Sequence, residues 1–311
     1  MKSPRLTQRQ GDSFEGRVVA SHGRRVKLEG PDGTTHDCQL AGRKLRLVCG
    51  DRVRWQLQAV SGGEGLVTEI LPRRSQLERI SLSGQPEVVV ANLDQLVAVL
   101  APLPEPDFGL CDRYLAAAEW QGLAAAVVLN KADLQGADDP RVKAELQTYR
   151  DLGYPVVRAS RDSGGTTSLE RLLRGHVNVL VGQSGVGKSS LINRMIPGVE
   201  ATVGEISAAT DEGRHTTTTS ALYHLPGGGE LMDSPGVRDF APPLPVPRDI
   251  ARGFRELEAA SAGCRFPDCR HDAEPGCEAR HQLAAGLINS RRFDSYLGLL
   301  RLAARYSGQR R

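Results

Sequence analysis

The stretch from Gly182 to Ser189 reads GQSGVGKS and decides the fold of the central part of this chain. It fits G-x-x-x-x-G-K-[ST] at every fixed position, and it lies between an apolar run at 176–181 and a helical pattern at 189–195. Small residues let backbone N–H groups turn inward around phosphate oxygens, and the helix N-terminus adds partial positive charge. The stretch therefore predicts a phosphate-binding loop between a strand and a helix of an α/β domain.

Two side chains of this loop carry charge and metal chemistry. Lys188 would neutralise the β- and γ-phosphates of a nucleotide, which makes it a predicted catalytic residue, and the Ser189 hydroxyl would bind Mg²⁺. The predicted phosphate-binding residues are Gly182, Gln183, Ser184, Gly185, Val186, Gly187, Lys188, Ser189 and Ser190.

A second motif, Asp233-Ser-Pro-Gly236, follows Lys188 by 45 residues and comes directly after an apolar run. It fits D-x-x-G, which alone is a common turn. At this distance behind a phosphate-binding loop it predicts that Asp233 holds Mg²⁺ through water and that the Gly236 N–H meets the γ-phosphate.

Residues 215–219, between these motifs, read His-Thr-Thr-Thr-Thr. A threonine in this interval should bind Mg²⁺ when a nucleoside triphosphate is present. We expect Thr217, with Thr216 and Thr218 as alternatives. Without that role the run would be the β-branched edge of a strand.

The residue after Gly236 is Val237, whose side chain cannot hydrogen-bond an attacking water molecule. Another group must then position the nucleophile, and we predict His215, because an imidazole can accept a proton near neutral pH. In the alternative interpretation, His215 contacts a partner or caps a loop.

The stretch Asn130-Lys131-Ala132-Asp133 follows the apolar run 124–129 and fits the guanine-reading pattern N-K-x-D. The Asp133 carboxylate can accept from guanine N1–H and N2–H₂ together, a pair of donors that adenine lacks, so an ATPase is disfavoured. A second guanine loop would lie around 159–161, where the match is poor. Because N-K-x-D precedes the phosphate loop, the sheet must be cut and rejoined in a permuted order.

The rest of the chain divides into three regions. Five short strands at 14–20, 25–28, 34–40, 51–57 and 65–71 predict an N-terminal all-β barrel of the OB type, in which Trp55 either stacks a base or packs in the core. Strands and helices then alternate: strands at 96–101, 124–129, 155–159, 176–181, 221–224 and 230–232, and helices at 111–121, 142–149 and 189–195. Helical patterns at 250–260 and 282–305 follow.

A cysteine cluster separates these last two helices. Cys264, Cys269, His271 and Cys277 offer four ligands within 14 residues, which predicts a closed, structural zinc site with one ion per chain. His281 is a competing ligand that the spacing favours less. We expect the scattered Cys38, Cys49 and Cys111 to be small buried side chains.

Charge is distributed unevenly over the 311 residues. The net charge is +6 over 1–82, −7 over 83–247 and +4 over 248–311. Basic ends favour polyphosphate partners such as nucleic acid, although charge can also serve solubility alone. No apolar run approaches the length of a membrane span, and the basic, polar start does not fit a signal peptide, so we expect a cytoplasmic protein without membrane contact.

Together these motifs resemble the circularly permuted, ribosome small-subunit-dependent GTPases of the RsgA type, over nearly the whole chain. The resemblance implies an OB-fold RNA-binding domain at 1–82, a circularly permuted GTPase domain at 83–245 and a zinc-binding helical domain at 246–311. It implies a GTP hydrolase that matures the small ribosomal subunit through contacts with its rRNA, with GTP, GDP and Mg²⁺ as ligands, and we expect a monomer. The alternative function is an RNA-binding assembly scaffold in which nucleotide is a structural or regulatory ligand.

Overall fold

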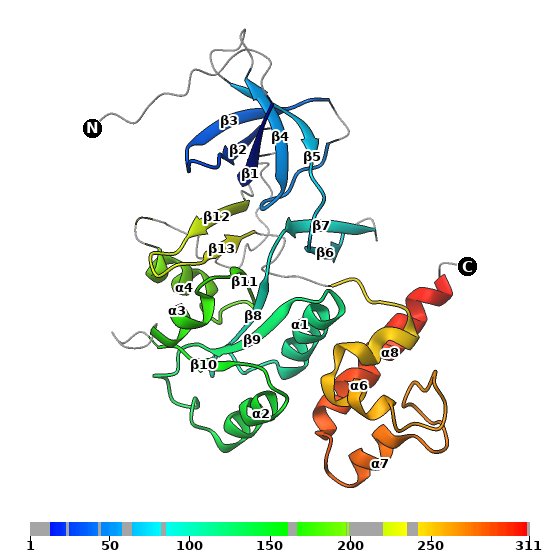
Figure 1. The fold of residues 1–311 in the computed structure, drawn as a ribbon. Helices are drawn as coiled ribbons and strands as arrows, with labels where there is room; N and C mark the ends of the chain where they lie inside the picture. Colours follow the sequence, from blue (N-terminus) through cyan, green and yellow to red (C-terminus); the bar gives the residue numbers. More distant parts are fainter. Residues whose placement is uncertain are drawn as a thin grey trace, which may run out of the picture.

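A closed five-stranded barrel forms the N-terminal part of the molecule, shown in blue in Figure 1. The computed structural model describes residues 13–22, 25–42, 45–57, 64–81, 85–160, 167–196, 198, 220–234 and 242–309. The barrel strands are β1 (Ser13–His22), β2 (Arg25–Glu29), β3 (Thr35–Leu40), β4 (Arg52–Leu57) and β5 (Gly65–Ile70). They pair in the order 1-2-3-5-4, and β4 closes back onto β1. This confirms the predicted OB-type barrel.

Alternating burial explains why these segments form strands. In β2, Val26 and Leu28 are buried while Arg25 and Lys27 are exposed, and β4 repeats this alternation with Val53 and Trp55 buried. Trp55 is only 2% exposed, so it belongs to the barrel core and has no free face on which a base could stack.

The central region is a sheet in the order β10-β9-β8-β11-β13-β12, covered by helices on both faces (Figure 1). Its strands are β8 (Gln95–Leu100), β9 (Ala124–Leu129), β10 (Val156–Arg158), β11 (Val177–Val181), β12 (Ser220–His224) and β13 (Glu230–Asp233). Its helices are α1 (Phe108–Trp120), α2 (Pro140–Asp151), α3 (Thr167–Leu173) and α4 (Lys188–Met195). All neighbouring strands are parallel except β12 and β13.

Successive residues of β8 pack on opposite faces of this sheet. Leu96, Ala98 and Leu100 pack with α1 and α2, whereas Val97 and Val99 pack with α3 and α4. The strand therefore reads as a continuous apolar run. The guanine half of the chain, β8 to β10, lies beside the phosphate half that follows it, which confirms the permuted order.

Four features differ from the sequence-based expectations. A two-stranded hairpin, β6 (Gln76–Ile80) and β7 (Pro86–Ala91), lies between barrel and central sheet, and helix α3 was not expected. The predicted helix 250–260 is divided into a 3₁₀ helix, η1 (Pro247–Gly253), and α6 (Arg255–Ser261), because Phe254 is extended.

The predicted helix 282–305 is also two helices, α7 (Glu278–Ala284) and α8 (Ser290–Gln309). Gly286 lies between them with φ at 73°, a left-handed conformation that ends a helix. Residues 242–309 contain no strand, as expected. Within the described ranges, no helix combines the length and the apolar character that a membrane crossing requires.

A buried ionic network attaches these C-terminal helices to α1. Asp112, fully buried in α1, accepts hydrogen bonds from Arg291 at 2.5 Å and from Arg292 at 2.7 Å. Arg292, only 1% exposed, also bonds Glu256 of α6 at 2.5 Å, and the Tyr149 hydroxyl donates to Asp112 at 2.9 Å. The guanidinium of Arg292 therefore joins the central and C-terminal regions.

We predict that Asp112→Ala lowers the free energy of unfolding by about 3–5 kcal/mol, because it leaves a buried guanidinium without its central partner. Denaturant unfolding of the full chain measures this. The control is Asp138→Ala, which removes an exposed carboxylate paired with Lys143 and Arg158 and should cost less than about 1 kcal/mol. Equal effects of the two variants would contradict the assignment.

Candidate functional site

The nucleotide motifs meet at one edge of the central sheet. Strands β9, β11 and β13 run parallel to β8 or to one another, and their carboxyl ends carry the guanine motif, the phosphate loop and Asp233 respectively. Ligands of open α/β sheets bind at this edge. The permuted chain therefore builds one site from segments far apart in sequence.

The phosphate loop needs its glycines. Gly182, Gly185 and Gly187 have φ values of 150°, 81° and 93°. A Cβ atom on Gly182 would lie 2.3 Å from the Val99 carbonyl oxygen, and one on Gly187 would lie 2.5 Å from Nδ2 of Asn130. Because Gly187 has no side chain to cap α4, the first-turn N–H groups suit an anion.

Two side chains of the guanine motif bind this loop directly. Asn130 donates from Nδ2 to the Val186 carbonyl at 2.8 Å. Lys131 donates from Nζ to the Gly185 carbonyl at 2.7 Å and to the Leu103 carbonyl at 2.8 Å. The segments predicted to read the base and to bind phosphate are therefore joined side by side.

The described part of the segment predicted as a second guanine loop also lies here. The Ala132 N–H donates to the Ala159 carbonyl at 2.9 Å, so the chain after β10 runs against the guanine motif despite its poor sequence match. Asp133 is exposed at this edge. Arg161, the last residue expected in that loop, lies outside the described residues.

The Lys188 side chain lies against the first residues of the phosphate loop. Its Nζ donates to the carbonyl oxygens of Gly182 at 2.5 Å and Gln183 at 2.9 Å. Phosphate oxygens of a nucleotide could replace these carbonyls as stronger, charged acceptors. This arrangement suits the role predicted for the lysine.

Two of the predicted Mg²⁺ ligands lie among the described residues. Ser189 lies in the first turn of α4, and Asp233 ends β13, the strand next to β11. A hydroxyl and a carboxylate are hard oxygen donors of the kind Mg²⁺ prefers, so this pair fits the ion. His215, Thr216, Thr217, Thr218, Gly236 and Val237 lie outside the described residues.

A loop at 101–107 supports the phosphate loop through hydrogen bonds, and this contact was not predicted from the sequence. Gln183 donates from Nε2 to the Glu105 carbonyl at 3.1 Å and accepts from the Asp107 N–H at 2.9 Å. Asp107 also caps α1 by accepting from the Leu110 N–H. The only available signal was the proline-rich sequence Pro102-Leu-Pro-Glu-Pro-Asp107, which marks a loop without revealing its contacts.

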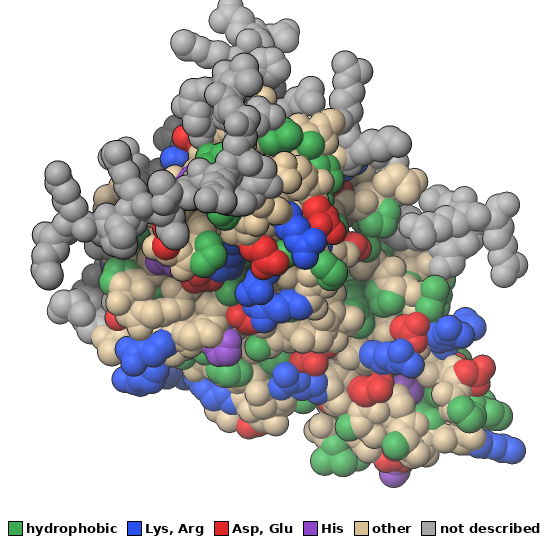
Figure 2. Space-filling view, turned by 45° about the horizontal axis from the view of Figure 1, so that its top comes forward, with side chains coloured by type: hydrophobic (Ala, Val, Ile, Leu, Met, Phe, Trp, Pro, Cys, Tyr) green, Lys and Arg blue, Asp and Glu red, His purple; other side chains and the backbone are tan. Residues whose placement is uncertain are grey.

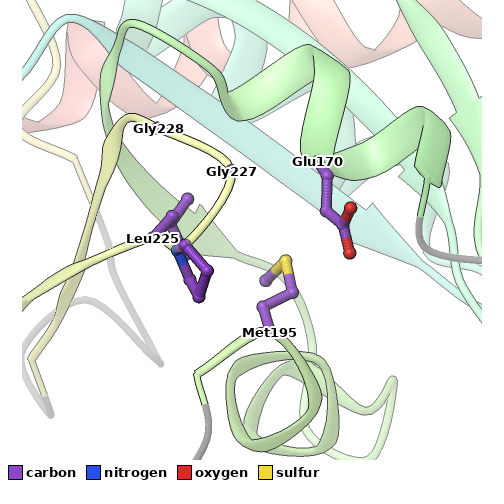
Figure 3. Close-up of a pocket in the computed structure, with 6 residues that line it drawn as sticks. Glu170, Met195, Leu225, Gly227 and Gly228 are labelled. Carbon is purple, nitrogen blue, oxygen red and sulfur yellow. The ribbon is translucent and has the colours of Figure 1, made fainter.

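A small cavity lies at the opposite edge of the sheet. Glu170 of α3 and Met195 of α4 face the turn that joins β12 and β13 (Figure 3). Its volume is about 130 Å³. That is below the usual size of small-molecule sites, so it does not compete with the nucleotide edge.

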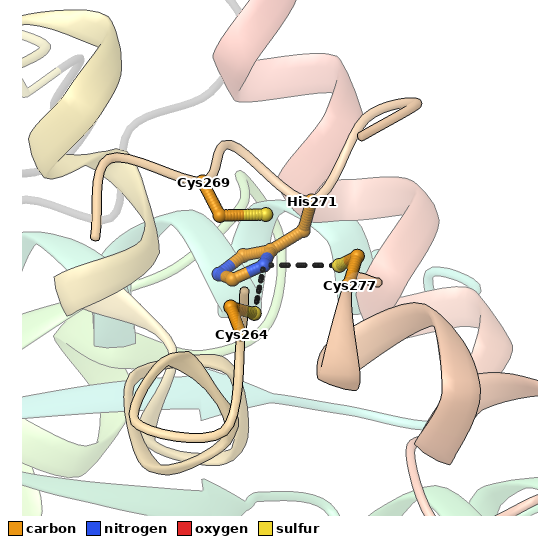
Figure 4. Close-up of side chains that lie close together, drawn as sticks. All are labelled: Cys264, Cys269, His271 and Cys277. Carbon is orange, nitrogen blue, oxygen red and sulfur yellow. Dashed lines mark hydrogen bonds between the residues drawn. The ribbon is translucent and has the colours of Figure 1, made fainter. Parts of the chain in front are cut away.

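The predicted metal cluster is assembled in the C-terminal region (Figure 4). The ligand atoms of Cys264, Cys269, His271 and Cys277 all lie within 4.8 Å of one another. Nδ1 of His271 is 3.3 Å from Sγ of Cys277 and 3.6 Å from Sγ of Cys264. Three thiolates and one imidazole suit a closed tetrahedral zinc site with a structural role.

His281, the competing ligand, is not part of this cluster. Its side chain is 79% exposed and lies near Glu278 on the surface of α7. His271 is fully buried, and burial lowers its pKa, which favours the neutral ring that binds metal. The structure therefore selects His271.

The other three cysteines are buried away from this cluster. Burial raises the pKa of the Cys111 thiol to about 12, and Cys38 and Cys49 share this shift for the same main reason. They remain protonated near neutral pH, as expected of small core side chains.

Ser261 orients the histidine and was not foreseen from the sequence. Its hydroxyl donates to the Leu257 carbonyl at 2.8 Å, so its oxygen can accept from Nε2–H of His271 at 3.0 Å. This bond fixes the tautomer in which Nδ1 faces the three sulfur atoms.

We predict that Ser261→Ala weakens zinc retention by about 10- to 100-fold, because the ring loses its orienting partner. Competition with a chromophoric chelator measures this. Ser261→Thr keeps the hydroxyl and should retain zinc, whereas Cys269→Ser removes a ligand and should lose it. Wild-type zinc affinity in Ser261→Ala would disprove the orienting role.

Comparison with known proteins places this arrangement in a family. A family model described as RsgA GTPase matches residues 70–242. The small ribosomal subunit biogenesis GTPase RsgA of Azotobacter vinelandii is 46% identical over 296 residues, covering 93% of this chain and 86% of the relative. The protein of the same name from Pseudomonas aeruginosa is 44% identical over 292 residues, with the same coverage.

Two solved structures share the architecture. The crystal structure of YjeQ from Thermotoga maritima matches with a TM-score of 0.76 and 30% identity, covering 94% of this chain and 99% of that chain. YloQ, described as a circularly permuted GTPase, matches with a TM-score of 0.74 and 23% identity over 97% and 99% of the two chains, which supports the fold alone. The chain therefore belongs to the RsgA GTPase family, a family of GTP-hydrolysing enzymes.

Proposed function

We propose that this chain hydrolyses GTP with Mg²⁺ during late maturation of the small ribosomal subunit. The observation that carries this proposal is the joining of the guanine and phosphate loops by the Asn130–Val186 and Lys131–Gly185 hydrogen bonds. A nucleotide lying across this edge would have its base at Asp133 and its phosphates at the N-terminus of α4. The names of the RsgA relatives supply the ribosomal context.

Each described residue then has a defined task. The N–H groups of the phosphate loop and the Lys188 ammonium hold the β- and γ-phosphates. The Ser189 hydroxyl would bind Mg²⁺, and Asp233 would hold it through water. Bound Mg²⁺ neutralises phosphate charge and fixes phosphate geometry. Water attacks the γ-phosphorus, the bond to the β–γ bridging oxygen breaks, and GDP and inorganic phosphate leave.

Three further assignments rest on the sequence alone. We assign Thr217 to Mg²⁺, the Gly236 N–H to the γ-phosphate, and His215 to the positioning of the attacking water. Because Val237 cannot orient that water, hydrolysis by the free protein should be slow. An ordered switch on the ribosome would supply the missing geometry.

The flanking regions are proposed to contact rRNA. We assign 1–82 to an RNA-binding barrel, 83–245 to the GTPase domain and 246–311 to the zinc-binding domain, in a cytoplasmic monomer. The net charges of +6 over 1–82 and +4 over 248–311 support this assignment. In Figure 2, Lys and Arg side chains are interspersed with Asp and Glu, so RNA contact on this face would use separate basic positions.

We predict that Asp133→Asn weakens GTP binding at least about a hundredfold and improves binding of xanthosine triphosphate, since one acceptor becomes a donor. Competition against a fluorescent guanine nucleotide measures both affinities. Asp138→Asn, another exposed aspartate nearby, should leave both unchanged. Equal affinity of the wild-type protein for ATP and GTP would contradict the guanine assignment.

The partner is tested by GTP turnover with small subunits, with large subunits and without ribosomes. We expect strong stimulation by small subunits alone, because they would order the catalytic switch. Lys188→Ala, which lacks the phosphate-binding ammonium, should abolish turnover in all three conditions. Tight subunit binding without any stimulated hydrolysis would favour the scaffold function instead.

A further inference from the structure

Barrel strand β1 continues past the end of its pairing with β4 at Arg17, and there it pairs with the central sheet while still paired with β2. Ala20 lies opposite Ala221 and Ser21 lies opposite Ser220 of β12, in antiparallel register. A β-bulge between Val18 and Ala20 interrupts the pairing of β1 with β2 just before this point. Bulges bend and redirect strands, so this one lets β1 serve two sheets. Barrel and central strands thereby form one eleven-stranded sheet.

Two cross-strand rows lead from this junction to the predicted Mg²⁺ ligand. In the first row, Ala20 faces Ala221, and Ala221 in turn faces Asp233 of β13. In the second row, Ser21 lies opposite Ser220, and the Ser220 hydroxyl lies 2.8 Å from the Ser234 hydroxyl. Ser234 is only 4% exposed, so its hydroxyl needs this partner.

The barrel also contacts β13 directly. Gly50, in the turn before β4, has φ at 90°, and a Cβ there would lie 2.5 Å from the Met232 methyl carbon and 2.0 Å from the Ala91 carbonyl oxygen. Met232 is the residue before Asp233. The turn thus packs against the end of the strand that carries the carboxylate.

Ion pairs secure the other end of β12. Arg17 of β1 lies 2.6 Å from Glu230, and their side chains are 21% and 19% exposed. His224 lies 2.7 Å from Glu29 of the barrel and 3.3 Å from Glu230. The barrel is therefore attached at both ends of β12 and at the start of β13.

We propose that Ser220 and Ser234 are positioning residues for Asp233, and that barrel strand β1 keeps this pair in place. The proposal rests on the proposed Mg²⁺ role of Asp233. Mg²⁺ demands near-ideal octahedral geometry, so a small displacement of the residue that holds its water weakens binding. The Ser220–Ser234 bond fixes the backbone at the point where β13 ends and the D-x-x-G segment begins.

The hydroxyl pair is tested by fluorescent GDP binding to the full chain, titrated with Mg²⁺ and repeated in a chelator. Ser220→Ala and Ser234→Ala should each raise the Mg²⁺ concentration for half-maximal tightening about three- to tenfold, the effect of one hydrogen bond. Affinity in chelator should stay unchanged. The double variant should be no worse than either single one, because both remove the same bond.

Matched variants separate positioning from general loss of structure. Ser234→Thr keeps a hydroxyl and should restore the Mg²⁺ dependence. Ser81→Ala removes a hydroxyl that bonds the Gln85 carbonyl in the β6–β7 hairpin, and it should have no effect. Wild-type Mg²⁺ dependence in both alanine variants, or additive effects in the double variant, would overturn the proposal.

The barrel contribution is tested with two arginines. Arg17→Ala breaks the junction ion pair with Glu230 and should raise the Mg²⁺ requirement in the same direction. Arg54→Ala breaks the Arg54–Glu69 pair inside the barrel and should not. Identical behaviour of the two variants would overturn the role of β1.

Asp233→Asn distinguishes this inference from the proposed function. If it loses the Mg²⁺ response while the serine variants keep it, the positioning proposal fails and the proposed function stands. If Asp233→Asn responds to Mg²⁺ like the wild type, the proposed metal role of Asp233 fails, and the positioning proposal fails with it.

Discussion

The hydrogen bond from the Asn130 side chain to the Val186 carbonyl holds together two loops that lie 56 residues apart in the chain. Asn130 is 5% exposed, so its amide must find a partner within the protein. The bond is possible only because Gly187 leaves room: a side chain there would collide with the amide nitrogen. The rest of the nucleotide edge depends on this fit. Loops that are joined by such bonds lose less conformational freedom when a ligand binds between them.

Much of this arrangement could be predicted because its signals are local. The apolar run 124–129 coincides with β9. A strand that is buried on both faces is apolar along its whole length, so its two ends can be located in the sequence. Turn signals between short segments at regular spacing revealed all five barrel strands. The phosphate, guanine and zinc motifs were recognisable because their chemistry requires fixed residue types at fixed spacing. Reversal of the motif order was sufficient to infer the permutation.

The remaining features depend on contacts between distant segments, which periodicity does not report. Asp112 is one of three charged residues in α1, and only the fold shows that two arginines about 180 residues away bind it. The break at Gly286 was missed because apolar spacing continues across it. Ser261 resembles any helical serine until His271 is placed beside it. The β1–β12 pairing was equally hidden, since both segments read as ordinary strands of separate domains.

The permuted strand order also determines which strand pairs can form early, and which must wait, while the chain is being synthesised. Strand β8 pairs with β11, which is synthesised about 80 residues later. The end of β1 pairs with β12, which is synthesised about 200 residues later. Until then the nascent chain carries two open strand edges, of the kind that pair with other chains or are held by chaperones. Parallel pairing across such gaps is slow because a long loop must close first. Among the described residues, β12 and β13 are the last strands in the sequence, and they complete both the central sheet and its junction with the barrel, so these two parts of the fold are finished only late in synthesis.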